Sequence, residues 1–137
     1  MFDKQRWNEE KYIPWQKVKD IWSKYWDLSK PILMDKSTPN IIRVSDIKQV
    51  FKPISFIAIV RNPYAQCEGI IRRNNQSAEF AAEFAIRCLK YQKKNIENEK
   101  NLLFFNYEEL CDNTHQVVNK INEFIPYNSD IKMKKKI

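Results

Sequence analysis

Phe56-Ile-Ala-Ile-Val-Arg-Asn-Pro63 is the stretch of sequence that decides the fold. Its first five residues are continuously apolar and β-prone, which predicts a strand buried on both faces. Asn62 is a good helix cap and Pro63 a good first helical residue, so a helix is expected to begin directly after the strand. Arg61 is thereby placed at the carboxyl end of a strand, beside a helix N-terminus. In open α/β sheets, ligands bind at this position.

Apolar periodicity predicts the remaining elements on either side of this stretch. Further helices are expected over residues 14–27, 45–51, 78–95 and 114–125, with a short one beginning at 107. Further strands are expected over Ile32-Leu33-Met34 and over 102–105. Strands that alternate with helices imply βαβ units and a parallel sheet with helices packed on its faces. The predicted fold class is therefore α/β, a three-layer sandwich with a short parallel sheet.

The length and composition favour one domain over residues 1–137. A chain of 137 residues with 43% hydrophobic and 13% aromatic residues can bury one core. Trp15, Trp22 and Trp26 recur at helical spacing, which indicates a packing stripe or, alternatively, a wall of an acceptor pocket. Residues 130–137 form a basic tail that is expected to be solvated or frayed.

The net charge of +7 predicts an anionic partner, such as a nucleotide, a sulfated or phosphorylated ligand, nucleic acid or a membrane surface. No apolar run approaches the roughly 18 to 20 residues of a membrane span, and the first residues do not resemble a signal peptide. The three cysteines have no metal-ligand spacing, and their odd number argues against a disulfide framework. A reducing, cytoplasmic location without a metal site is expected.

Three blocks, in this order and spacing, resemble the sulfotransferase family that uses 3′-phosphoadenosine 5′-phosphosulfate. They are Pro31-Ile-Leu-Met-Asp-Lys-Ser-Thr-Pro-Asn40, Phe56-Ile-Ala-Ile-Val-Arg-Asn-Pro63 and Leu102-Leu-Phe-Phe-Asn-Tyr-Glu-Glu-Leu110. The resemblance covers roughly residues 30 to 125. It implies a P-loop-NTPase-like sulfotransferase fold.

The resemblance also implies roles for four residues. Arg61 matches the arginine that holds the 3′-phosphate of the donor, and a guanidinium grips phosphate in a planar, bidentate way. The helix N-terminus beside it would add amide donors. Tyr107 matches a tyrosine that contacts the adenine. Gly69 stands where the family has a serine that binds the same phosphate, so a backbone amide or Arg72 would have to replace that hydroxyl. Lys36 matches a lysine that stabilises charge on the transferring sulfuryl group, and it is the predicted catalytic residue.

Two further features of the family are missing from this sequence. The loop rich in Gly, Ser and Thr that wraps the 5′-phosphosulfate has no counterpart before Gly69, the only glycine. The usual catalytic base, a His or Glu, is not found either. His115 lies in the last third of the chain, and Glu9 and Glu10 are candidates by position alone. The fold is expected to be truncated at its N-terminus, as in a fragment of an enzyme or in a reduced, non-catalytic relative.

The expected function is transfer of a sulfuryl group from 3′-phosphoadenosine 5′-phosphosulfate to a hydroxyl or amine acceptor. The alternative is a non-catalytic basic module that binds nucleic acid or another polyanion, supported by the +7 charge, Arg72-Arg73 and the basic tail. The dispersed cations disfavour nucleic acid as a partner, because a nucleic-acid binder gathers them on one face. A nucleotide kinase is disfavoured because the sequence contains no Gly-x-x-x-x-Gly-Lys-Ser/Thr motif.

Overall fold

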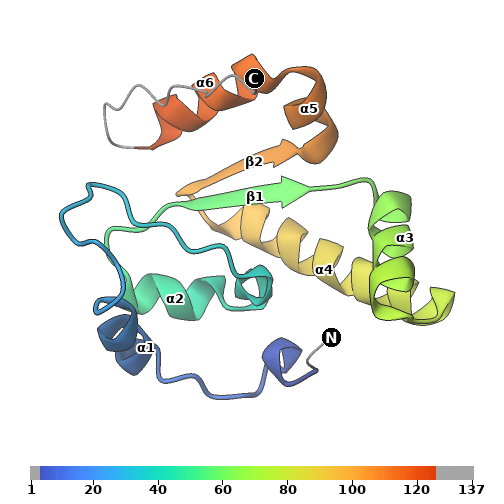
Figure 1. Ribbon diagram of the computed structural model, residues 1–137, viewed down its shortest axis with the longest axis horizontal. Helices are drawn as coiled ribbons and strands as arrows, with labels where there is room; N and C mark the ends of the chain where they lie inside the picture. The colour runs from blue at the N-terminus through green and yellow to red at the C-terminus, as the bar shows by residue number, and fades with distance from the viewer. Residues whose placement is uncertain (1–3, 126–137) are drawn as a thin grey trace.

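Two short parallel strands, β1 (Phe56–Val60) and β2 (Leu102–Asn106), lie between the helices of the fold (Figure 1). Their register pairs Phe56 with Leu102 and Val60 with Asn106, so both strands end at the same edge of the sheet. The computed structural model describes residues 4–125, and the predicted basic tail at 130–137 lies outside the described residues. Within that range the chain is a mixed α/β structure with six α-helices and this two-stranded sheet.

Two helices connect the strands, as predicted. α3 (Pro63–Asn74) begins directly after β1, and the Asn62 side chain caps it by accepting hydrogen bonds from the Tyr64 and Ala65 amides. α4 (Ala78–Asn98) is capped by the Ser77 hydroxyl, which accepts from the Phe80 amide. Helix α4 contacts both strands and runs beneath them in Figure 1. This strand–helix–strand connection explains why β1 and β2 are parallel.

The last two helices lie on the other side of the sheet from α4 (Figure 1). α5 (Tyr107–Asp112) begins at the residue after β2, and α6 (Thr114–Phe124) returns across that strand. Phe105 of β2 is only 2% exposed, and Val117 of α6 is fully buried. These two apolar side chains are the largest that the fold buries almost completely within the described residues.

The prediction that β1 is buried on both faces is wrong for one face. Ile57 and Ile59 are 42% and 46% exposed, whereas Phe56, Ala58 and Val60 are half-buried. Ile59 is paired with Phe105 in register, so the two side chains lie on the same face of the sheet. Because α6 contacts β2, it buries Phe105 and leaves the neighbouring isoleucines of β1 open to solvent. The apolar run predicted the strand and could not predict how far a later helix would cover it.

The first half of the chain packs around an aromatic cluster. Besides the 3₁₀ turns Lys4–Trp7 (η1) and Thr38–Ile42 (η2), it contains α1 (Trp15–Trp22) and α2 (Val44–Val50). The ring centroids of Trp15, Trp22 and Trp26 lie 5.7 to 6.5 Å from that of Phe51. The tryptophans therefore form a packing stripe, although α1 ends at Trp22 and not at the predicted residue 27.

The predicted strand Ile32-Leu33-Met34 is wrong. These residues belong to no helix or strand, and their exposed fractions are 39%, 39% and 80%. A strand requires a neighbour that accepts and donates its ladder hydrogen bonds. Within residues 4–125, β1 pairs only with β2, so the segment stays outside the sheet.

Candidate functional site

Arg61 and Tyr107 meet at the edge of the sheet where both strands end. Each follows directly after the last residue of its strand, and those last residues, Val60 and Asn106, are register partners. The Arg61 guanidinium carbon lies 5.1 Å from the centroid of the Tyr107 ring, within the range of a cation–π contact. Parallel pairing thus brings together two residues that are 46 positions apart and to which the family resemblance gives one ligand.

The Arg61 side chain is available to an anion. It is exposed, and within residues 4–125 it makes no ion pair with a carboxylate within 4.0 Å. Tyr107 is 43% exposed beside it. The N–H donors of a guanidinium lie in one plane, and two of them can donate in parallel to two oxygens of a phosphate.

The amide donors expected at the start of α3 already have partners within the protein. The Tyr64 and Ala65 amides donate to the Asn62 side chain at 2.9 and 3.3 Å, and the Gln66 amide donates to the Asn62 carbonyl. The Asn62 amide donates to a carboxylate oxygen of Glu108 at 3.0 Å. A phosphate at this edge would therefore depend on the Arg61 side chain, unless it breaks one of these hydrogen bonds.

Glu108 is the residue of this edge that the sequence reasoning missed as part of the site. It lies in the first turn of α5, where an acidic residue is simply explained by the helix dipole. Its pKa is lowered first by the hydrogen bond from the Asn62 amide, then by its own backbone amide and by the charge of Arg61. A carboxylate therefore faces the start of α3 and stands near the guanidinium at neutral pH. Only the pairing of distant segments reveals this contact.

Gly69 is buried inside α3, away from any position at the helix start. Arg73 donates to the Gly69 carbonyl at 3.0 Å, and a Cβ at residue 69 would come within 3.0 Å of an Arg73 nitrogen. Glycine thus makes room for the Arg73 side chain. Arg72, the suggested substitute donor, is paired with Glu68 at 2.7 Å. The role of Gly69 in nucleotide binding stays a prediction without a contact that favours it.

Lys36 is exposed in the irregular segment before η2, and within residues 4–125 no contact joins it to Arg61 or Tyr107. The neighbouring Asp35 organises this segment by accepting hydrogen bonds from the Ser37 hydroxyl and from the side-chain amide nitrogen of Asn40. The catalytic role of Lys36 also stays a prediction.

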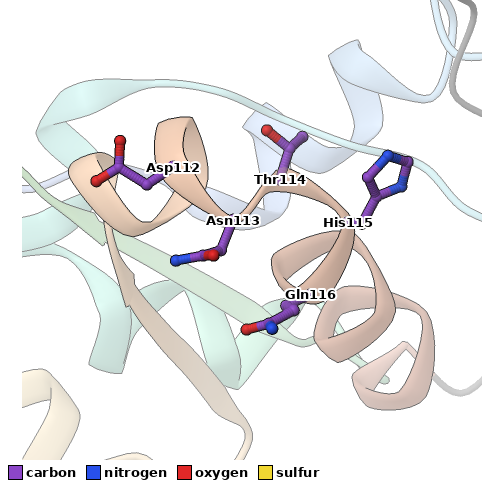
Figure 2. A pocket seen from close by; sticks show the side chains of 5 residues that line it. All are labelled: Asp112, Asn113, Thr114, His115 and Gln116. Carbon is purple, nitrogen blue, oxygen red and sulfur yellow. The ribbon is translucent and has the colours of Figure 1, made fainter.

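The candidate bases do not gather at the Arg61 edge. Glu9 is paired with Arg87 at 2.6 Å, and the Glu10 backbone amide is bound by the Asn8 side chain. His115 lies beside a shallow depression of about 400 Å³ at the turn between α5 and α6. Figure 2 shows its ring pointing away from Asp112 at the opposite end of this depression. These side chains diverge and do not form an acid–base pair.

Cysteine and metal chemistry find no support in the described residues. Burial raises the pKa of the Cys88 thiol to about 11, so it is not an activated nucleophile. Cys67 and Cys111 are also free thiols. Residues 4–125 contain no group of three His, Cys, Asp or Glu side chains that could hold a metal ion. The same part of the chain contains no helix that is long and apolar enough to cross a membrane.

Comparisons with known proteins do not assign a family. No protein-family model, no curated protein and no solved structure matches this chain. Its function is therefore inferred from the geometry of the site and from the sequence resemblance.

Proposed function

We propose that this chain binds the nucleotide 3′-phosphoadenosine 5′-phosphosulfate, or its product 3′-phosphoadenosine 5′-phosphate, as the nucleotide-binding part of a sulfotransferase. The observation that carries the proposal is the contact between Arg61 and Tyr107 at the carboxyl ends of two parallel strands. A cation for a phosphate and an aromatic ring for a purine stand side by side there, at the edge where α/β sheets bind ligands.

Each of the two residues has a distinct role in the proposed complex. Arg61 would hold the 3′-phosphate through two parallel N–H donors, and the phosphate would offset its positive charge. Tyr107 would contact the adenine with its ring or its hydroxyl. The resemblance places both residues at the matching positions of the family, and the finer P-loop-NTPase-like assignment of the fold belongs to the same proposal. The sulfuryl group would pass directly to a hydroxyl or amine, with Lys36 offsetting the negative charge between donor and acceptor.

The net charge of +7 favours a second candidate, a non-catalytic module for nucleic acid or another polyanion. Several of the cations that would contribute are held by carboxylates, namely Arg72 by Glu68, Lys48 by Glu99 and Lys120 by Glu109. Arg73, the neighbour of Arg72, donates to the Gly69 carbonyl. A polyanion would spread over many cations, so a single substitution at Arg61 would change its affinity little.

Replacing Arg61 with alanine is expected to weaken binding of 3′-phosphoadenosine 5′-phosphate at least tenfold, about 1.4 kcal/mol. The change removes the guanidinium that is proposed to hold the 3′-phosphate. Calorimetric titration of the wild type and the variant measures the difference. Arg6→Ala is the matched control, because Arg6 is an exposed arginine of η1.

A second ligand tests the assignment of the phosphate. Adenosine 5′-monophosphate lacks the 3′-phosphate, and its affinity should be nearly the same for the wild type and Arg61→Ala. Equal loss of both ligands would assign Arg61 to another group of the nucleotide. Unchanged binding of 3′-phosphoadenosine 5′-phosphate in a folded Arg61→Ala protein would remove the proposed site.

A further inference from the structure

The Glu108 carboxylate links the ends of the two strands through the backbone of the loop that carries Arg61. One of its oxygens accepts the Asn62 amide hydrogen at 3.0 Å. Asn62 follows Arg61 directly, so its backbone amide could serve as a second donor to an anion bound by Arg61. The Glu108 carboxylate occupies that amide. Glu108 itself follows Tyr107, the ring that contacts the guanidinium. The pair Arg61-Asn62 thus lies beside the pair Tyr107-Glu108. The negative charge of Glu108 opposes the binding of a phosphate.

Each backbone amide that residues 62–66 offer has an acceptor within the protein, and Glu108 supplies the only charged acceptor among them. The Asn62 side chain and carbonyl take the Tyr64, Ala65 and Gln66 amides, which are ordinary parts of a capped helix. The Asn62 amide is different, because its acceptor comes from α5, 46 residues away. In a capping box a Glu or Gln at the third helical position accepts the amide hydrogen of the N-cap residue. That position in α3 is Ala65, which has no side-chain acceptor, and Glu108 of α5 takes this place.

We infer that Glu108 is a built-in competitor of the bound phosphate: it occupies the Asn62 amide beside Arg61 and lowers the affinity of this edge for anions. The inference rests on the proposed nucleotide function and names the residue that limits its affinity. A phosphate that reaches Arg61 comes close to this carboxylate, and the two negative charges repel each other. The repulsion ends when Glu108 leaves Asn62 and the phosphate accepts the freed amide hydrogen. In a transferase such a competitor favours release of the spent nucleotide.

Glu108→Gln separates the charge of this side chain from its hydrogen bond. Glutamine has nearly the same shape and keeps an oxygen that can accept from the Asn62 amide. If Glu108 served only to order the start of α3, the variant would bind the nucleotide equally well or less well. If Glu108 competes with phosphate, the variant binds it more tightly. The sign of the change therefore distinguishes the two roles.

Glu109→Gln is the matched control. Glu109 is the next residue on α5, and its pKa is also lowered, chiefly by a hydrogen bond from Lys120. Lys120 belongs to α6, so the Glu109 carboxylate is engaged with that helix, whereas Glu108 is engaged with the start of α3. Both variants remove one negative charge from neighbouring residues and change the net charge of the protein equally.

The experiment is calorimetric titration of wild type, Glu108→Gln and Glu109→Gln with 3′-phosphoadenosine 5′-phosphate at pH 7. We expect Glu108→Gln to bind about fivefold more tightly than wild type, and Glu109→Gln to stay within about twofold. Repeating the titrations at about 0.05 M and about 0.5 M salt should shrink the advantage of Glu108→Gln, because salt screens repulsion between exposed charges.

Each outcome separates this inference from the proposed function on which it rests. If Glu108→Gln binds more tightly than wild type and Glu109→Gln does not, the inference is supported. This holds even when binding by the wild type is too weak to measure. Wild-type binding that Arg61→Ala abolishes, together with unchanged or weaker binding by Glu108→Gln, overturns the inference and leaves the proposed function standing. Equal gains in both glutamine variants overturn it too, because a general charge effect would explain them. No binding by any of these proteins overturns both.

Discussion

Replacing Phe105 with alanine is expected to lower the free energy of unfolding by about 3 to 5 kcal/mol, the largest effect anticipated for a single side chain here. The ring is 2% exposed and lies on the face of β2 that α6 covers. Its removal leaves a cavity between the sheet and α6, beside the fully buried Val117. Because α6 depends on this face for its packing, its helical content should decrease together with stability.

Phe104→Ala is the control for this prediction. Phe104 is the preceding residue of β2, points to the opposite face and is 41% exposed, so its truncation should cost only about 1 kcal/mol. Urea denaturation followed by circular dichroism gives both free energies. Equal losses in the two variants would contradict the assignment of the covered face.

Replacing Arg43 with alanine is expected to lower the free energy of unfolding by about 2 to 4 kcal/mol, the second largest effect. Arg43 is 5% exposed. Its guanidinium donates to the backbone carbonyls of Asn8 and Glu9 and lies 3.8 Å from Asp46. The truncated variant leaves those two carbonyls without their donors and removes the tie between the N-terminal segment and the core. Lysine at this position should recover only part of the loss, because it lacks the planar fork of donors.

Arg87→Ala is a graded control for Arg43→Ala. Arg87 also holds the N-terminal segment, through the Trp7 carbonyl and Glu9, but its side chain is 41% exposed. Its replacement should lower the free energy of unfolding by about 1 kcal/mol, because water solvates and screens the charges of an exposed ion pair. Thermal unfolding ranks the variants, and limited proteolysis near residue 10 reports release of the segment. A larger loss for Arg87→Ala would mean that Arg43 is not the main tie.

The elements with strong local signals could be predicted from the sequence. The apolar run 56–60 gave β1, and Asn62-Pro63 and Ser77 marked the starts of α3 and α4 at the residues where the structure has them. These signals depend on neighbours a few residues away, as helix caps and strand runs do. The placement of Arg61 and Tyr107 at one edge followed from the parallel pairing of the strands that precede them.

Features that depend on distant contacts escaped prediction. Ile32-Leu33-Met34 has the composition of a strand, yet no neighbouring strand pairs with it within residues 4–125. Exposure of Ile57 and Ile59 is set by the position of α6, about 60 residues later in the chain. The contact of Glu108 with the Asn62 amide joins residues 46 positions apart. Local patterns carry no information on such pairings.

The central claim is that a nucleotide binds at the edge formed by Arg61 and Tyr107. The most direct test is an NMR titration of the isotope-labelled chain with 3′-phosphoadenosine 5′-phosphate, which locates binding residue by residue. The proposed site predicts saturable shifts of backbone amides centred on residues 60–64 and 106–109, and their loss in Arg61→Ala. Shifts spread over the exposed lysines of α1 and α4, or no shifts in a folded protein, would contradict it.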